Sequence, residues 1–258
     1  MTDTKAQVFR FDVDNSNGVI KGGRIAHLNN GGAITENRRF YYAADTALIR
    51  QVGDSFVSIA IGSGHRAHPL NKQVIDKFFV VKDKGVLTGS YDMDASFANL
   101  QDITSLVDTT GNGISNAVTI LNDPNANKKG WYLSFSNTGE KVIDRSITFN
   151  NAVIFTSYIP PGANSNNTCQ AAAGSGRLYA LNILNGNPYI DTNHDGTLNE
   201  NDRFVDLVGA GIAPSPQVLL ESGLDGITPR LCIGTECGFD QLLPPTTKGL
   251  MGIKWRKN

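Results

Sequence analysis

Short apolar strands that each run into a glycine-closed polar turn recur along this chain and limit what it can fold into. Four such units end at Gly18, Gly85, Gly139 and Gly186, so their closing glycines are 67, 54 and 47 residues apart. The intervals are irregular but lie near the ~40–50 residues of a four-stranded propeller blade. The 27 glycines and 10 prolines in the chain also favour strands joined by turns.

Further strands are expected between these units. The candidates, all rich in β-branched or aromatic residues, are residues 56–61, 118–121, 146–149, 152–158, 217–220 and 231–233. Residues 146–158 are broken only by Asn150 and Asn151, which predicts a hairpin with a two-residue turn. Helical spacing is rare; residues 90–107 carry apolar side chains at intervals of three and four and predict one short helix or two helical turns.

The fold class predicted from this pattern is all-β, a modified β-propeller with one short helix. We see no linker that would divide residues 1–258, so the sequence predicts a single domain. It opens directly in a strand at residues 8–13, which suits the C-terminal part of a longer protein. About five blades of ~50 residues would account for the chain length.

Composition excludes several classes of partner. A net charge of −1 and a pI near 6.4 leave no basic excess for nucleic acid. No apolar run approaches the ~20 residues that span a bilayer, so no membrane-spanning segment is expected. The polar start of the chain lacks the apolar core of a signal peptide, which indicates a cytoplasmic protein or an excised fragment.

Residues 191–202, DTNHDGTLNEND, have the spacing of an EF-hand-type calcium loop. Oxygen-bearing side chains stand at loop positions one, three, five, nine and twelve, and Gly196 at position six permits the sharp turn that makes them converge. The predicted Ca²⁺ ligands are Asp191, Asn193, Asp195, Thr197 through its carbonyl, Asn199 and Asp202.

Position twelve leaves the ligand set open. Asp202 is shorter than the usual glutamate and resembles the same position in dockerin loops, so either Asn199 or Asp202 completes the shell. The alternative is a polar surface turn without an ion. Four carboxylates within twelve residues would then repel one another, so an ion is expected to order the loop.

Two other groups of residues invite a chemical interpretation. Cys232 and Cys237 are spaced for a small disulfide loop, which would indicate an oxidising compartment, or for two reduced buried thiols. His65 and His68 form a His-x-x-His pair around Arg66, but no third ligand is recognisable. The alternative is a strand-end turn in which these side chains satisfy buried carbonyls.

Several segments in order resemble the C-terminal propeller region of the PilY1/PilC family, the tip-associated proteins of bacterial type IV pili. The resemblance runs from about residue 8 to the C-terminus and is carried by residues 10–13, 22–25, 36–41, 59–70, 139–142, 155–158, 177–182, 211–216 and 232–237.

The resemblance implies a secreted or cell-surface β-propeller at the pilus tip, associated with the outer membrane. Its partners would be pilins or minor pilins and a host or surface ligand. Bound calcium would control pilus extension against retraction, and so twitching motility and cell adhesion. The family pattern has Asp where this chain has Asn199. The ligands around the ion therefore carry less negative charge in this chain, unless Asp202 takes that place.

The sequence favours a binding protein over an enzyme. It contains no phosphate-binding glycine loop, no Gly-x-Ser-x-Gly elbow and no coherent acid-base cluster. The alternatives from other classes are a quinoprotein-like propeller enzyme, which the Leu-Tyr-Ala-Leu-Asn strand at residues 178–182 resembles, and a calcium-dependent carbohydrate-binding module.

Overall fold

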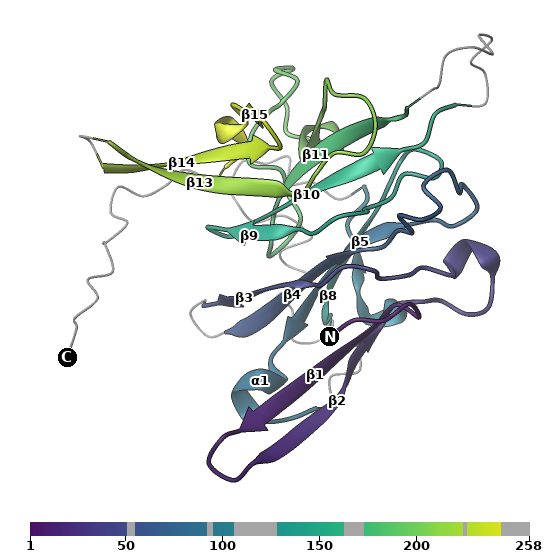
Figure 1. The fold of residues 1–258 in the computed structure, drawn as a ribbon, viewed down its shortest axis with the longest axis vertical. Coiled ribbons are helices and arrows are strands. Elements are labelled where there is room, and N and C mark those ends of the chain that lie inside the picture. Colours follow the sequence, from purple (N-terminus) through teal and green to yellow (C-terminus); the bar gives the residue numbers. More distant parts are fainter. Residues whose placement is uncertain (51–54, 92–94, 106–127, 163–172, 224–225, 244–258) are drawn as a thin grey trace.

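A computed structural model describes residues 1–50, 55–91, 95–105, 128–162, 173–223 and 226–243. The described strands form four sheets of three, five, four and three strands, and most neighbours in a sheet follow one another along the chain. Figure 1 shows the sheets in succession, from the N-terminal hairpin to the C-terminal sheet. Apart from two short strands that pair in parallel, the pairing within the sheets is antiparallel. Successive sheets of this kind are the arrangement of propeller blades, so the prediction of an all-β, modified β-propeller fold is confirmed.

The first two sheets contain the N-terminal half of the described strands. The first sheet comprises β1 (Gln7–Asp14), β2 (Val19–His27) and β6 (Ala95–Ser96), in the order β1-β2-β6. The second comprises β3 (Asp45–Ile49), β4 (Phe56–Gly62), β5 (Lys77–Asp83), β7 (Gln101–Asp102) and β8 (Gly130–Ser134), in the order β3-β4-β5-β8-β7.

The third and fourth sheets follow in the same manner. The third is a four-stranded antiparallel meander of β9 (Ile147–Phe149), β10 (Ala152–Ile159), β11 (Ser175–Asn182) and β12 (Phe204–Asp206). The fourth contains β13 (Pro216–Gly223), β14 (Gly226–Ile233) and β15 (Glu236–Cys237). Helical segments in the described residues are short: α1 (Gly85–Thr88), η1 (Ile34–Glu36), η2 (Phe97–Asn99), η3 (Glu200–Arg203) and η4 (Asp240–Leu242).

Each core cluster lies between two neighbouring sheets, because side chains on a strand alternate between its faces. In β5, Phe78 packs with the third sheet, where its ring stacks on Phe155 at 3.8 Å between centroids, whereas Phe79 packs with the first sheet. In β10, Phe155 faces the second sheet and Ile154 faces the fourth. The central strands are therefore buried on both faces, which fixes the sheets against one another.

The predicted hairpin of residues 146–158 is confirmed. Phe149 pairs with Ala152, and the two residues between them, Asn150 and Asn151, have φ angles of +45° and +66°. Positive φ at both central residues defines the turn that matches the twist of a two-residue hairpin, and asparagine tolerates it better than most residues.

Of the one short helix or two helical turns predicted over residues 90–107, the described part contains a single 3₁₀ turn, Phe97–Asn99, and the prediction of a continuous helix there is wrong. Residues 95–105 form β6, the 3₁₀ turn η2 and β7 instead. Leu100 packs in the cluster between the first and second sheets, whereas Ile103 packs in the cluster between the second and third. A spacing of three thus reflects a segment that passes from one core to the next. The strand predicted at residues 118–121 lies outside the described residues.

Candidate calcium site

The predicted calcium loop connects β11 to β12 and ends in the 3₁₀ turn η3. Its middle is exposed, whereas Asp202 at its end is only 2% exposed. Two residues, His194 and Gly196, have φ angles of +59° and +85°. These left-handed residues wrap the chain back on itself, as predicted for Gly196.

Asp195 lies at the centre of the loop's hydrogen bonds. Its Oδ1 accepts from the backbone N of Thr197 at 2.9 Å and from the Thr197 hydroxyl at 2.7 Å, and its Oδ2 accepts from the amide nitrogens of Asn193 at 2.9 Å and Asn199 at 3.3 Å. These bonds, with the Thr197 hydroxyl the largest cause, lower the pKa of the Asp195 carboxyl. Its charged form is therefore favoured at neutral pH.

Asp191 closes the same ring from the start of the loop. Its carboxylate accepts from the backbone N of Asp195 at 3.3 Å and of Gly196 at 2.8 Å. The carbonyl of Thr197 accepts from the Asn199 amide at 3.2 Å. The side chains at positions one, three, five and nine and the carbonyl at position seven are thus all linked within one small network.

Asp202 is engaged differently, by the backbone of both ends of the loop. Its Oδ1 accepts from the N and hydroxyl of Thr192 at 2.9 and 3.1 Å and from the N of Asn193 at 3.4 Å. Its Oδ2 accepts from the N of Asn199 at 2.8 Å, and the Asn199 side chain in turn accepts from Asn201 N as the cap of η3. Asp202 therefore ties the ends of the loop together through hydrogen bonds alone.

The donor set of this loop fits a hard divalent cation. Asp191, Asn193, Asp195, Asn199 and the Thr197 carbonyl offer only oxygen ligands once the two amides turn their oxygens inward, and such a set suits Ca²⁺. In the part of the chain that the structure describes, no group of three or more His, Cys, Asp or Glu side chains is placed to hold a metal ion. Coordination would thus depend on the amide and carbonyl oxygens as much as on the two carboxylates.

His65, Arg66 and His68 lie in the loop between β4 and β5. The His65 ring stacks on Tyr41 with 4.6 Å between centroids and meets the edge of His68 at 4.5 Å. Arg66 donates to the Tyr42 hydroxyl at 3.3 Å and to the carbonyl of Ile143 at 3.4 Å. The guanidinium thus satisfies a backbone carbonyl as one alternative predicted, while the imidazoles make ring contacts.

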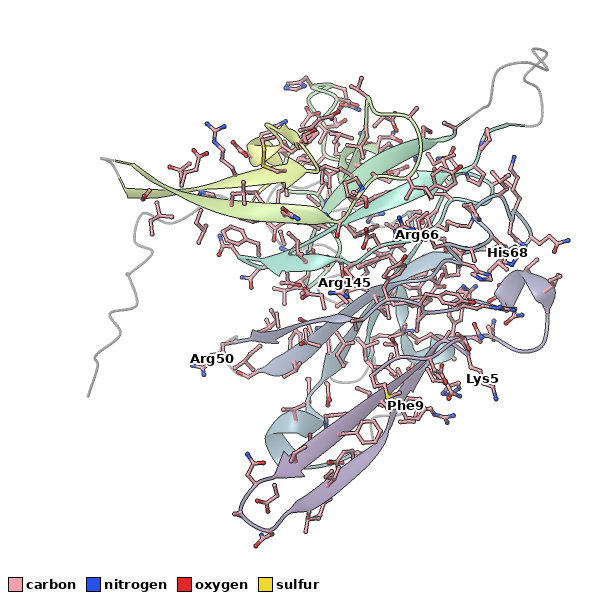
Figure 2. The ribbon with its side chains drawn as sticks, in the orientation of Figure 1. Lys5, Phe9, Arg50, Arg66, His68 and Arg145 are labelled. Carbon is pink, nitrogen blue, oxygen red and sulfur yellow. A yellow bond between two sulfur atoms is a disulfide. The ribbon has the colours of Figure 1, made fainter. Side chains whose placement is uncertain are left out.

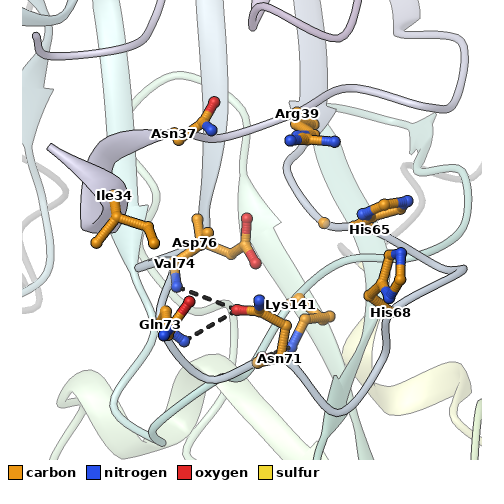
Figure 3. Close-up of a pocket in the computed structure, with 11 residues that line it drawn as sticks. Ile34, Asn37, Arg39, His65, His68, Asn71, Gln73, Val74, Asp76 and Lys141 are labelled. Carbon is orange, nitrogen blue, oxygen red and sulfur yellow. Dashed lines mark hydrogen bonds between the residues drawn. The ribbon is translucent and has the colours of Figure 1, made fainter. Parts of the chain in front are cut away.

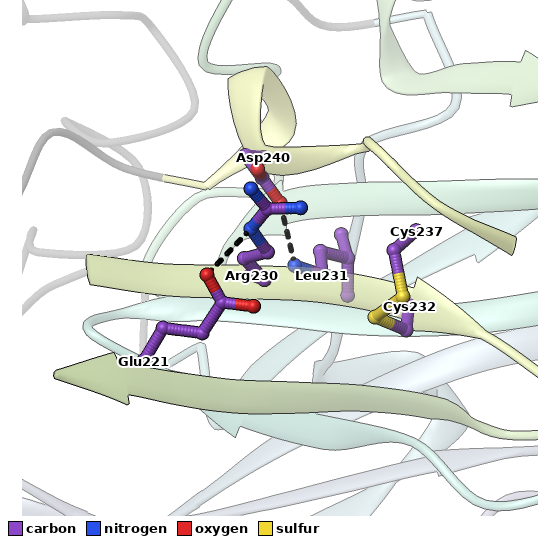
Figure 4. The surroundings of a disulfide bond; sticks show 6 residues. All are labelled: Glu221, Arg230, Leu231, Cys232, Cys237 and Asp240. Atoms are coloured by element: carbon purple, nitrogen blue, oxygen red, sulfur yellow. Dashed lines mark hydrogen bonds and ion pairs between the residues drawn. A yellow bond between two sulfur atoms is a disulfide. The ribbon is translucent and has the colours of Figure 1, made fainter. Parts of the chain in front are cut away.

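Cys232 and Cys237 form a disulfide across the pairing of β14 with β15 (Figure 4). Of the two alternatives open from the spacing, the structure adopts the small disulfide loop. The bridge holds β15 to the end of β14, beside Leu231, whose backbone N donates to Asp240 at 2.8 Å.

A group of buried charges at the ends of β4 and β5 was not predicted from the sequence. Arg38, Asp76 and Lys141 are 0%, 4% and 2% exposed, and Asp76 and Lys141 line a cavity of about 300 Å³ (Figure 3). These three residues come from segments far apart in the sequence. The sequence contains one sign of these buried charges, namely a charged residue directly before or within a run of apolar strand residues. Asp76, shortly before the apolar residues 78–81, is an example.

Neither a protein-family model nor a curated protein sequence matches this chain. Among solved structures, the crystal structure of the PilY1 C-terminal domain of Pseudomonas aeruginosa matches with a TM-score of 0.59 and 16% sequence identity. The two chains are similar in fold. The match covers 92% of this chain and 55% of the PilY1 chain, so this chain spans about half the length of that domain. No helix among the described residues is long and apolar enough to cross a membrane.

Proposed function

We propose that this chain is a calcium-binding, non-enzymatic β-propeller of a type IV pilus protein. The observation that carries the proposal is the likeness of its fold to the PilY1 C-terminal domain over 92% of the chain. The loop of residues 191–202 adds to it, since its six predicted ligand residues lie in one hydrogen-bonded network.

Calcium would be held by Asp191, Asn193, Asp195, the Thr197 carbonyl and Asn199, with Asp202 as the alternative ligand at the end of the loop. A divalent ion supplies charge that offsets the repulsion between the loop carboxylates. The protein's own part would be to turn the chain back at His194 and Gly196, whose φ angles are positive, so that these carboxylates share one hydrogen-bonded network.

The loop is connected to the rest of the fold through Arg203, directly after Asp202. Arg203 is 2% exposed, and it donates to the carbonyl of Gly186 at 3.0 Å and to that of Thr104 at 2.9 Å. Thr104 follows β7 of the second sheet, whereas Gly186 follows β11 of the third. On this proposal, order that calcium induces in the loop would bear on the junction of two blades through Arg203.

On this proposal the protein acts at the cell surface, at the pilus tip. Its partners would be pilins or minor pilins, and a surface or host ligand in adhesion. Calcium-dependent order at the blade junction would bias the balance between pilus extension and retraction, and hence twitching motility. The Cys232–Cys237 disulfide supports an oxidising location of this kind.

Calorimetric titration of Ca²⁺ into chelator-stripped protein tests the calcium part of the proposal. We expect one site per chain, and at free calcium ~1,000-fold above the dissociation constant the folded state gains about 4 kcal/mol. Asp195→Ala should abolish the binding heat and the calcium-induced shift in melting temperature.

Glu200→Ala is the matched control, because it also removes one exposed carboxylate of the loop region but at a position that is not a ligand. It should leave calcium binding within about twofold of the unchanged chain. An Asp195→Ala protein that keeps the full calcium response would remove this loop from the proposal.

A further inference from the structure

A cavity of about 300 Å³ lies away from the calcium loop, where η1 and the residues after it meet the loop between β4 and β5. Its wall includes Arg39, His65, His68, Asp76 and Lys141. Figure 3 shows Asp76 at the centre, with Arg39 and the two imidazoles on one side and Asn37 and Gln73 on the other. Pockets of this volume stand at the small end of ligand sites.

Asp76 lies in the wall of the cavity and is only partly satisfied by the protein. It is 4% exposed, and its Oδ1 accepts from the hydroxyl of Ser63 at 2.7 Å. Among the described residues no hydrogen bond reaches its Oδ2. The buried side-chain atoms of the described residues that lack a partner do not include Asp76 Oδ2. This oxygen is therefore accessible from the cavity, where it offers an acceptor to a ligand that carries hydrogen-bond donors.

The cations near Asp76 are already held by the protein. Lys141 Nζ donates to the carbonyls of Pro69 at 3.1 Å and Asn71 at 2.8 Å, and also to that of Gly139. Arg38 donates to the carbonyl of Ile75 at 2.8 Å and pairs with Glu36. Because both positive charges act on Asp76, a second ammonium group beside it would be repelled. Neutral hydroxyl groups are therefore better donors to Asp76 than an amine would be.

The rim of the cavity carries positive charge without a matching anion. Arg39 donates to the Tyr41 hydroxyl at 3.4 Å, and no carboxylate of the described residues pairs with it. His65 and His68 lie next to it, fixed by their mutual ring contact and by the stacking of His65 on Tyr41. A guanidinium in this setting favours a carboxylate, which it can hold through two parallel hydrogen bonds.

From this arrangement we infer that the cavity binds an acidic monosaccharide unit, a hexuronic acid or similar sugar acid, with its hydroxyls on Asp76 and its carboxylate on Arg39. The amides of Asn37 and Gln73 line the opposite wall and both donate and accept, as sugar hydroxyls do. The inference concerns a different site from the calcium loop and does not rest on the proposed calcium function.

The test is titration of the whole chain with glucuronate, galacturonate and mannuronate, each beside its neutral hexose, and with acetate and inorganic phosphate. We expect at least one uronate to bind with one site per chain and about tenfold more tightly than its neutral sugar and than either simple anion. Removal of calcium with a chelator should leave this binding unchanged.

Three variants locate the site. Arg39→Gln should remove the roughly tenfold preference for the uronate over the neutral sugar, because only the carboxylate contact is lost. Asp76→Asn should weaken both sugars. Arg50→Gln, an exposed arginine at the other side of the molecule from His68 (Figure 2), should change neither.

Several results would overturn the inference. One is phosphate or acetate binding as tightly as every uronate, which would make this a simple anion site. Others are the absence of saturable uronate binding, uronate binding that Arg39→Gln leaves intact, and uronate binding that the chelator abolishes. Thermal melts of each variant establish that it is folded, and Arg39 at the rim can be changed without touching the buried charges.

Discussion

The two loops that carry the candidate sites differ in what holds them in place. The loop of residues 191–202 is held mainly by its own short side chains, such as Asp191 and Asp195, which bond to backbone nitrogens two to five residues away. The loop between β4 and β5 is held by long side chains from distant segments. Arg38 reaches a carbonyl 37 residues away, and Lys141 reaches one 70 residues away.

The difference separates an adjustable site from a fixed one. A loop held by its own exposed side chains can change its hydrogen bonds when an ion enters without disturbing the core. A loop pinned by buried cations can form only when its sheets have come together, and the cavity beside it is then already shaped for a ligand. Preformed sites lose less free energy to ordering when they bind.

The largest effect is expected where the pinned loop loses one of its distant supports. Arg38→Ala removes a fully buried guanidinium that donates to Ile75, Leu28 and Glu36, so two carbonyls and a carboxylate lose their donor. We expect the free energy of unfolding to fall by about 3–5 kcal/mol, as when one partner of a buried charged pair is removed. Denaturant unfolding followed by circular dichroism measures it.

Arg50→Ala is the control for this substitution, since Arg50 is exposed and should cost less than about 0.5 kcal/mol. A loss for Arg38→Ala no larger than the loss for Arg50→Ala would show that distant cations do not hold the β4–β5 loop. The comparison between the two loops would then fail.

The same difference explains what the sequence could and could not predict. The turn at Asn150 and Asn151, the strands with alternating apolar residues and the sharp turn at Gly196 all depend on neighbours in the chain, and they were predicted. Ile103 misled the prediction because its spacing from Leu100 is helical although the two enter different cores. The buried cluster of Arg38, Asp76 and Lys141 brings three separate segments together, and no local pattern contains that information.

The next effect depends on pH and belongs to the fixed site. Burial raises the pKa of Asp76 from 3.8 to about 6. Since the folded state binds this proton more tightly than the unfolded state, the stabilisation is fully present below about pH 4 and is lost as the pH rises through about 6. Asp76→Asn keeps the neutral form at every pH. It should be more stable than the unchanged chain by about 2–3 kcal/mol near pH 8 and equal to it near pH 4.

Urea unfolding at both pH values measures this difference, with Glu236→Gln as an exposed carboxylate control that should show no pH-dependent gain. If Asp76→Asn were less stable than the unchanged chain near pH 8, the carboxylate would be satisfied in the fold. Asp76 would then not be available as an acceptor for a ligand in the cavity.

The smallest effect separates the two residues that compete for the last place in the calcium shell. Asp202 is buried and accepts from Thr192, Asn193 and Asn199 at both ends of the loop. The less buried Asn199 side chain caps η3 by accepting from Asn201 N, and it donates to Asp195 and to the Thr197 carbonyl. Without calcium, Asp202→Ala should lower the free energy of unfolding by about 2 kcal/mol. Asn199→Ala, which loses a cap that is half exposed, should cost less, about 1 kcal/mol.

Calcium then distinguishes their roles. If Asp202 only ties the loop, the calcium-induced gain in stability survives in Asp202→Ala and shrinks in Asn199→Ala, because a ligand is lost only in the second variant. If Asp202 is itself a ligand, as in the dockerin-like pattern, its loss removes the gain as well. Melting curves of each variant, recorded with chelator and with excess calcium, separate the two outcomes. The loss of a ligand reduces the calcium-induced rise in melting temperature, whereas the loss of a structural hydrogen bond lowers both melting temperatures. In that second outcome, Asp202 would give up its hydrogen bonds to the loop backbone in order to coordinate the ion. The loop between β4 and β5 cannot rearrange in this way, because buried cations from distant segments hold it.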